Sequence, residues 1–218
     1  NGVLMQTERA GDEAQSEFLR SSDSWFRPAA IRTGPDGGMY IADLYRLVIE
    51  HPQWIDDTLE RKLIANGRLR AGHDRGRIYK VLPERANLHQ QATLTGRKPA
   101  DLAVALDSPN GWQRDTAHMM LTWLSKNEQR KAIPALMKVL QSKHPAARAQ
   151  AMSALADLEA LSATAMQVGL DDSHPGVRRN ALRVGGHLFN IDAALGQRAV
   201  TLLGDDDAHV QRQAAYAL

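Results

Sequence analysis

The feature that most constrains the fold is an internal repeat in the C-terminal part of the sequence. Alanine recurs at positions 117, 151, 181 and 214, with spacings of 34, 30 and 33 residues, and each alanine follows a segment typical of a helix start. Two of these segments begin with Pro145 and Pro175, and proline is preorganised for the first helical turn. A period in the thirties is typical of stacked helix pairs, because one pair alone cannot bury its apolar face. The sequence therefore predicts an α-solenoid.

This pattern predicts four helix pairs. The first helices of the pairs are expected at residues 100–107, 130–141, 163–170 and 193–203, and the second helices at residues 111–124, 146–158, 176–189 and 208–218. The arrangement resembles short HEAT-type repeats over residues 86–218. The last helix ends on the apolar run Ala214–Leu218, where a terminal repeat needs a polar outer face, so the array is expected to continue beyond the end of the chain.

The N-terminal part has a different periodicity. Two short apolar runs, Ala29–Thr33 and Met39–Ala42, flank Gly34–Gly38, and a Pro-Asp-Gly-Gly corner is typical of a β-hairpin turn. The segment Gly76–Leu82 is predicted to form a third strand, with Ile78 and Val81 pointing inward. Three or four strands bury too little surface to be stable alone, so we expect this part to be one blade of a larger structure.

An insertion, residues 51–72, separates the second and third predicted strands and lacks their periodicity. Its segment Asp56–Ile64 has an acidic start and a basic end, which matches the helix dipole and predicts a short helix. Trp54 is expected to anchor the insertion to the sheet. Long connections are usually functional lids or interface elements, and a decorated turn that docks onto the solenoid is the alternative.

The N-terminal motifs occur in a specific order. Ser22–Pro28 (SDSWFRP) precedes Gly34–Gly37 (GPDG), Met39–Arg46 (MYIADLYR), Ile49–Pro52 (IEHP) and Arg70–Tyr79 (RAGHDRGRIY). This order closely resembles the closing blade of the membrane-bound dehydrogenase family of planctomycetes and verrucomicrobia. In that family, a β-propeller related to NHL repeats and to quinoprotein sugar dehydrogenases precedes HEAT repeats, and a cytochrome c domain often follows.

The resemblance implies an α+β multidomain fragment. Residues 1–85 would be the C-terminal blade of a β-propeller, and residues 86–218 would be the α-solenoid of HEAT-type repeats. The family is located in the periplasm or at the membrane of the bacterial cell envelope. By the same resemblance, the complete propeller would oxidise a sugar or an alcohol with PQQ and pass electrons to haem c in a cytochrome domain outside this chain. No cofactor is expected within the chain itself, and the fragment alone is expected to be inactive.

Polar residues gather next to the predicted strand ends. They are Arg27, Asp43, Tyr45, Arg46, His51, His73, Asp74 and Arg75. The resemblance makes His51 or His73 the base that removes the alcohol proton. The other six would contact the quinone, whose carboxylates and reduced ring require cationic partners such as Arg27, Arg46 or Arg75.

Each of these residues also has a structural interpretation. Asp43 would tie down the turn of its own hairpin, and Arg75 would pair with an acid of a neighbouring blade. A histidine beside Pro52 would be an ordinary loop residue. These interpretations stay open at the level of the sequence.

Composition excludes several classes of site. The 218 residues include no cysteine, which excludes disulfides, Cys-ligated zinc and C-x-x-C-H haem attachment within the chain. No metal site is expected, because HExxH and EF-hand patterns are absent and Asp205–Asp207 lie where a helix cap is expected. No apolar run is long enough to span a membrane.

Charge does not indicate a nucleic-acid partner. Up to and including Arg85 the chain has 13 basic residues (Lys and Arg) and 13 acidic residues (Asp and Glu). After Arg85 it has 14 basic and 12 acidic residues. Arginines nevertheless recur in the second helices of the repeats, where they either bind phosphates or bridge neighbouring helices. They are Arg148, Arg178, Arg179, Arg183 and Arg212.

Three functional classes follow from the sequence. The first is the redox protein described above, with upstream blades and downstream repeats of the same polypeptide and a cytochrome as partners. The second is a non-catalytic scaffold that presents binding surfaces to other proteins. The third, a binder of nucleic acid or phosphate, has the least support.

Overall fold

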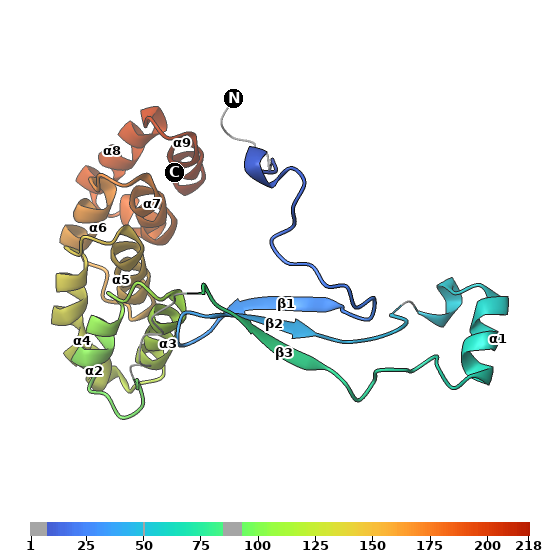
Figure 1. Ribbon diagram of the computed structural model, residues 1–218. Helices are drawn as coiled ribbons and strands as arrows, with labels where there is room; N and C mark the ends of the chain where they lie inside the picture. Colours follow the sequence, from blue (N-terminus) through green and yellow to red (C-terminus); the bar gives the residue numbers. More distant parts are fainter. Residues whose placement is uncertain (1–7, 50, 85–92) are drawn as a thin grey trace. The chain divides into compact units, whose positions relative to one another are not determined.

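A computed structural model describes residues 8–49, 51–84 and 93–218 of the chain (Figure 1). The described residues form two compact units, one within residues 8–84 and the other within residues 93–218. The predicted domain boundary between residues 85 and 86 lies outside the described residues. Each unit is treated by itself below.

The larger unit contains eight α-helices in its described residues. They are α2 (Pro99–Ala105), α3 (Gly111–Thr122), α4 (Lys126–Val139), α5 (Pro145–Asp157), α6 (Ala163–Leu170), α7 (Pro175–Phe189), α8 (Ala193–Thr201) and α9 (Ala208–Ala217), with a 3-10 turn, Leu202–Gly204, after α8. All eight predicted helices are confirmed. The largest difference is the start of α4, which begins four residues before the predicted Arg130. It does so because Ser125 caps the helix, its Oγ accepting the Glu128 N–H at 3.4 Å.

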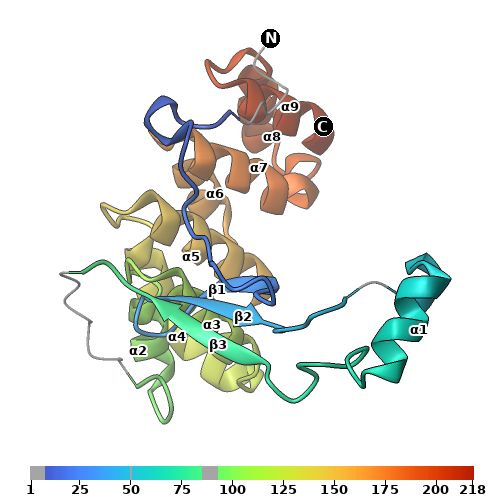
Figure 2. The same ribbon diagram turned by 45° about the vertical axis from the view of Figure 1, so that its right-hand side comes forward.

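The eight helices of the larger unit form two layers (Figures 1 and 2). The helices α2, α4, α6 and α8 lie in one layer, and α3, α5, α7 and α9 lie in the other. Fully buried leucines, among them Leu121, Leu136, Leu155 and Leu182, fill the space between the layers. Small residues let helices approach closely, since a Cβ on Gly169 would lie 2.3 Å from the sulfur of Met152. The unit is therefore a stack of helix pairs with one continuous apolar core.

The smaller unit is built on a three-stranded antiparallel sheet in the order β1-β2-β3. Its strands are β1 (Pro28–Thr33), β2 (Met39–Asp43) and β3 (Arg77–Val81). Ile31 lies opposite Ile41, and Ile41 lies opposite Tyr79 on the other side. Gly37, at φ 84°, supplies the left-handed residue that the turn between β1 and β2 needs. The three predicted strands are confirmed.

The predicted insertion contains a 3-10 turn, Pro52–Trp54, and the helix α1 (Asp57–Ala65). Asp56 caps α1, and its side chain accepts the N–H groups of Thr58 and Leu59 at 2.9 and 3.2 Å. The short predicted helix is thus confirmed. A further 3-10 turn, Gly11–Glu13, precedes the sheet.

The propeller blade predicted for residues 1–85 is wrong. The described residues of the smaller unit hold a single sheet of three short strands, whereas a propeller blade is a four-stranded sheet. The turn and strand signals of this segment are local, and they specified the hairpin correctly. Assembly into a blade depends on contacts between residues far apart in the sequence, and local turn and strand signals give no information about such contacts.

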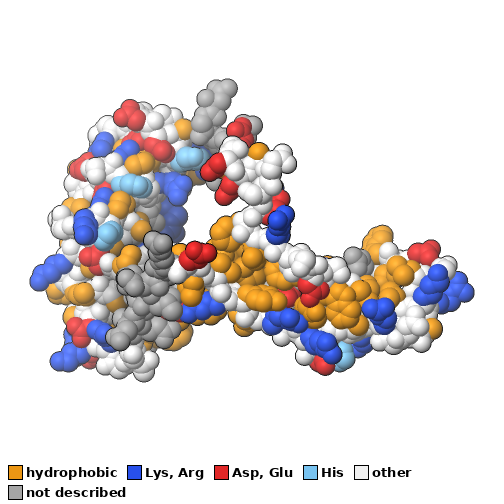
Figure 3. Space-filling model, in the orientation of Figure 1, with side chains coloured by type: hydrophobic (Ala, Val, Ile, Leu, Met, Phe, Trp, Pro, Cys, Tyr) orange, Lys and Arg blue, Asp and Glu red, His pale blue; other side chains and the backbone are white. Residues whose placement is uncertain are grey.

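Two side chains of the smaller unit also differ from expectation. Ile78 was predicted to point inward but is 72% exposed, because it pairs with Ala42 on the face opposite to the buried Ile41. Trp54, the expected anchor of the insertion, is 76% exposed. Figure 3 shows the resulting hydrophobic side chains on the surface of this unit.

Over the ranges that the structure describes, no helix combines the length and apolar character that crossing a bilayer requires.

Candidate functional site

Asp43 organises one group of the predicted site residues. It lies at the end of β2 with 2% of its surface exposed, and its Oδ1 accepts the N–H groups of Arg27 and Tyr45 at 2.7 and 2.8 Å. The Arg46 N–H donates to the carbonyl of Trp25 at 3.0 Å. The structure thus brings Arg27, Asp43, Tyr45 and Arg46 together, and Asp43 ties down the end of its own strand.

The side chains of this group are held by aromatic contacts. The rings of Trp25 and Tyr45 are 5.6 Å apart, and the Arg77 guanidinium lies 3.6 Å from the centre of the Tyr45 ring. Tyr45 has a φ of 49°, and the loop that contains Gly72 approaches it so closely that a Cβ on Gly72 would lie 2.1 Å from the Tyr45 carbonyl oxygen. Arg27 donates to the carbonyls of Ser24 and Phe26. The close approach of Gly72 holds the last residue of the insertion against Tyr45, which precedes the insertion in the chain.

His73, Asp74 and Arg75 belong to a second group. They line a hollow of about 300 Å³, whose other lining residues include Trp25 and Arg70. The Nδ1 of His73 lies 3.0 Å from the Arg70 carbonyl oxygen, an ordinary loop contact. His51 lies beside the turn that begins the insertion, where its Nδ1 faces the Gln53 N–H at 3.5 Å. It is not among the residues that line the hollow of His73.

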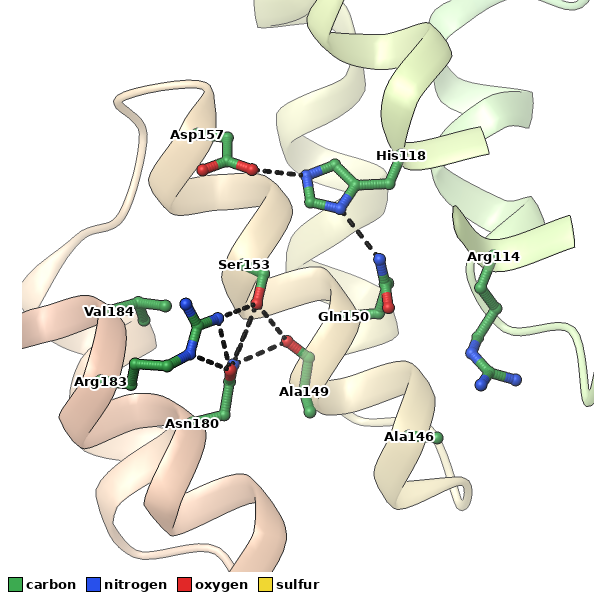
Figure 4. A pocket seen from close by; sticks show the side chains of 10 residues that line it. All are labelled: Arg114, His118, Ala146, Ala149, Gln150, Ser153, Asp157, Asn180, Arg183 and Val184. Carbon is green, nitrogen blue, oxygen red and sulfur yellow. Dashed lines mark hydrogen bonds and ion pairs between the residues drawn. The ribbon is translucent and has the colours of Figure 1, made fainter. Parts of the chain in front are cut away.

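A more extensive polar surface lies on the larger unit, along the layer of α3, α5, α7 and α9. A hollow of about 450 Å³ is lined by side chains from three of these helices (Figure 4). Its lining residues are Arg114, His118, Ala146, Ala149, Gln150, Ser153, Asp157, Asn180, Arg183 and Val184. Second helices of three successive repeats thus contribute to one site.

His118 occupies one end of this hollow. Its Nδ1 lies 2.9 Å from the Nε2 of Gln150, and its Nε2 lies 3.0 Å from a carboxylate oxygen of Asp157 (Figure 4). An amide N–H donating to Nδ1 leaves the ring proton of a neutral histidine on Nε2. Nε2 is close to Asp157 but has no hydrogen-bond partner among the described residues, so the bond to Gln150 is the one that joins α3 to α5 here.

Asn180 and Arg183 of α7 form the other end, together with Ser153 of α5. Asn180 Nδ2 donates to the Ala149 carbonyl at 2.9 Å, and Arg183 Nη2 donates to Asn180 Oδ1 and Ser153 Oγ at 2.9 and 3.2 Å. Ser153 Oγ lies within 3.2 Å of the Ala149 carbonyl oxygen. Its hydroxyl therefore faces a carbonyl and an amide rather than a base, which does not favour a nucleophilic role.

The polar surface continues towards α9. A second hollow of about 390 Å³ shares Ala149, Asn180 and Arg183 with the first and adds Arg179 and Arg212. Figure 3 shows Lys, Arg and His side chains on this side of the unit. The two adjoining hollows form a surface rich in guanidinium and amide groups, which we call the B face.

Two other arginines of the same helices have a structural role. Arg148 of α5 binds Asp172 through two hydrogen bonds of 2.6 Å, and Arg178 of α7 binds Asp205 through two hydrogen bonds of 2.8 and 2.7 Å. These side chains are 6–14% exposed. Each arginine joins its own helix to the loop of the next repeat, and we call these pairs the Arg–Asp ladder.

The ladder also orders the loops. Asp172 accepts the His174 N–H at 2.8 Å, and Asp205 accepts the Asp207 N–H at 2.9 Å. Hydrogen bonds from Arg178 lower the pKa of Asp205. Burial acts to raise the pKa of Asp172, but its hydrogen bonds to Arg148 and His174 outweigh that effect and lower it. Asp207 caps α9, as predicted for this acidic run.

The sequence singled out the arginines of the second helices but missed their polar neighbours. Arg148 and Arg178 bridge neighbouring repeats, whereas Arg179, Arg183 and Arg212 line the B face. His118, Gln150, Ser153, Asp157 and Asn180 were not singled out. Gln150, Ser153 and Asp157 stand three and four residues apart in an alanine-rich helix, and this spacing is the signal that predicts a shared polar face.

Comparisons with known proteins each match a part of the chain. Residues 1–85 match a family model described as a domain of unknown function (DUF7133), and that description states no activity. No curated protein matches the chain. Among solved structures, the crystal structure of an engineered protein, a target of the Northeast Structural Genomics Consortium, is 21% identical with a TM-score of 0.41 over 56% of this chain. The chain spans 61% of the length of that protein.

Proposed function

We propose that the larger unit is a protein-interaction module that binds an acidic polypeptide segment along the B face. The observation that carries this proposal is the pair of adjoining hollows, lined by donor groups from the second helices of successive repeats. Stacked helix pairs create extended surfaces of this kind, on which a partner contacts several repeats at once. The proposal develops the scaffold function expected from the sequence.

The charge of the B face favours an acidic partner. Arg179, Arg183 and Arg212 are exposed and line one hollow, and Asp157 is the acidic residue that lines the other. Among the described residues, Arg179 has no ion pair or hydrogen bond from its side chain, so its charge is available to a partner. Guanidinium groups bind carboxylates through paired hydrogen bonds. A nucleic acid is less well matched, because the chain carries a net charge of only +2 and its ladder arginines are already paired.

The redox function implied by the resemblance stays a prediction. It relied on a propeller that oxidises a sugar or an alcohol, and the smaller unit has a three-stranded sheet instead. The roles of His51 and His73 as bases, the cytochrome partner and the cell-envelope location likewise stay predictions. The proposed function depends on none of them.

Peptide binding tests the proposal directly. Fluorescence anisotropy of a labelled twelve-residue peptide of alternating Glu and Ala is expected to show saturable binding, weakened by added salt because exposed charges are screened. The matched peptide of alternating Lys and Ala is expected not to bind. The double variant Arg179→Glu, Arg183→Glu is expected to weaken binding of the acidic peptide by at least about tenfold, because it replaces two exposed attractions of up to about 1 kcal/mol each with repulsions.

The control carries the same charge change on the opposite layer. Arg130 and Lys138 are exposed residues of α4, and the double variant Arg130→Glu, Lys138→Glu is expected to bind the acidic peptide as the unaltered chain does. Equal weakening by both double variants would mean that net charge, rather than the B face, attracts the peptide. Preference for oligo-dT over the acidic peptide would favour a nucleic-acid partner and contradict the proposal.

A further inference from the structure

The first position of the Arg–Asp ladder differs from the other two. Arg114, Arg148 and Arg178 occupy equivalent positions, each three residues before a repeat alanine, and Asp172 and Asp205 are equivalent to Ser142. Arg148 and Arg178 each bind the aspartate of the next repeat. For Arg114 the equivalent residue of the next repeat is Ser142, and a serine cannot offer the two carboxylate oxygens that the other arginines bind.

Arg114 nevertheless has the conformation of its equivalents. Its Nη1 donates to the Ser108 carbonyl at 2.8 Å, just as Arg148 Nη1 donates to the Ser142 carbonyl at 2.8 Å. Arg178 Nη1 makes the same contact with the Asp172 carbonyl at 2.9 Å. This shared bond leaves the edge formed by Nε and Nη2 free in each arginine, and it is the edge that holds aspartate in the other two.

Ser142 performs only part of the role of the aspartates. Its Oγ accepts the His144 N–H at 3.0 Å, as Asp172 accepts the His174 N–H, so the loop is ordered in the same way. The hydroxyl itself donates to Asp107. Among the described residues, Arg114 has no ion pair, and its Nε is buried without a hydrogen-bond partner. A buried charged donor without a partner is costly, and a carboxylate would remove that cost.

Arg114 also lines the 450 Å³ hollow of the B face, next to Ala146 and on the same helix as His118. We infer that the Nε–Nη2 edge of Arg114 binds a carboxylate of the acidic partner segment, as the same edges of Arg148 and Arg178 bind Asp172 and Asp205. This inference rests on the proposed function. The partner thus supplies the acid that the first position of the ladder lacks. The ligand class is an aspartate or glutamate side chain, or a chain-terminal carboxylate.

The position of Asp107 sets the design of the test. Its carboxylate contacts Ser142 and would repel an aspartate introduced there, so the variants are compared in an Asp107→Asn background. In that background Ser142→Asp supplies an internal acid for Arg114, and Ser142→Asn is the matched control without the charge. Ser142→Asp is expected to raise the melting temperature relative to Ser142→Asn, because it completes the ladder. Equal melting temperatures would overturn the inference that the Arg114 edge accepts a carboxylate.

Binding provides the second readout. The alternating Glu–Ala peptide is expected to bind Ser142→Asp at least about tenfold more weakly than Ser142→Asn, because the internal carboxylate competes for Arg114. Arg114→Gln in the same background should weaken binding similarly. Equal affinity of the Ser142 pair would overturn the inference and leave the proposed function intact.

A small probe separates the two hypotheses if the peptide does not bind. N-acetyl-aspartate is titrated while the Nε–H resonance of Arg114, assigned by its loss in Arg114→Gln, is followed by NMR. A saturable shift in the background protein that is absent from Ser142→Asp supports the carboxylate site even without peptide binding. No shift in either protein, or the same shift in both, contradicts it.

Discussion

The larger unit buries a continuous apolar core, whereas the smaller unit buries one large apolar side chain among its described residues. In the larger unit the core runs from Leu94 to Ala214 through every helix pair. In residues 8–84, Ile41 is the buried hydrophobic residue, while Ile31 and Ile78 are more than half exposed. Each helix pair adds buried surface to its neighbours, but a sheet of three short strands has too little area to do the same.

The smaller unit relies instead on specific local contacts. Asp43 accepts two backbone N–H groups, the rings of Phe26 and Tyr79 meet edge to face at 5.8 Å, and Arg77 lies on the ring of Tyr45. Such contacts fix geometry, but each contributes little free energy compared with the burial of a large apolar side chain. The difference indicates that the larger unit determines the stability of the chain.

Separating the units should have the largest effect. Residues 93–218 alone are expected to unfold cooperatively with a helical circular dichroism spectrum, because their buried residues form one continuous apolar core. Residues 8–84 alone are expected to show no cooperative transition and to aggregate through open strand edges. A cooperative melt of residues 8–84 in isolation would show that local contacts suffice to fold the sheet.

Truncation of a core side chain is the next test. Leu155 of α5 is fully buried, so Leu155→Ala is expected to lower the free energy of unfolding by about 2–5 kcal/mol. The matched truncation in the smaller unit, Ile78→Ala, removes an exposed side chain and is expected to cost less than about 0.5 kcal/mol. Urea denaturation measures both changes, and comparable losses would contradict the assignment of stability to the larger unit.

Removal of a ladder arginine should cost less than the leucine truncation. Arg148→Gln leaves the buried Asp172 without its paired donors, and we expect a loss of about 2–3 kcal/mol. The control is Arg179→Gln on α7, an exposed arginine with no ion pair among the described residues, which is expected to change stability by less than about 0.5 kcal/mol. A double-mutant cycle with Asp172→Asn measures the coupling, and a coupling near zero would exclude the ladder as a stabilising feature.

The smallest expected effect is the pH dependence of the ladder. The pKa values of Asp172 and Asp205 are lowered in the folded chain, so their contribution to stability is complete above their unfolded pKa of about 3.9. It is lost as the pH falls through the lower folded values, because the folded state must then take up protons. The fall in melting temperature below about pH 4 should be shallower in the double variant Asp172→Asn, Asp205→Asn. An unchanged slope would mean that other carboxylates determine acid unfolding.

The sequence predicts more of the larger unit than of the smaller unit, because the larger unit is built from repeated local contacts. Helix positions in the larger unit follow from local signals, such as Pro145, Pro175 and the cap Asp207, and from a period that imposes neighbour-to-neighbour packing. The strands of the smaller unit were also predicted correctly. The sequence did not predict which face of the sheet is buried. Alternation in β3 is compatible with either face, and the face of Ile41 is buried where the rings of Phe26 and Tyr79 meet, whereas Ile78 is exposed.

By itself the sequence determined the elements, their order and the repeat, because caps, turn residues and periodicity act over a few residues. Tertiary structure alone decided which arginines are available to a partner. Arg148, Arg178 and Arg179 are similar in sequence context, yet two are paired with aspartates 24 and 27 residues away and the third is exposed on the B face. The physical reason is that an ion pair depends on where the next repeat places its loop. The same holds for Arg114, because the equivalent residue of the next repeat is Ser142 instead of an aspartate.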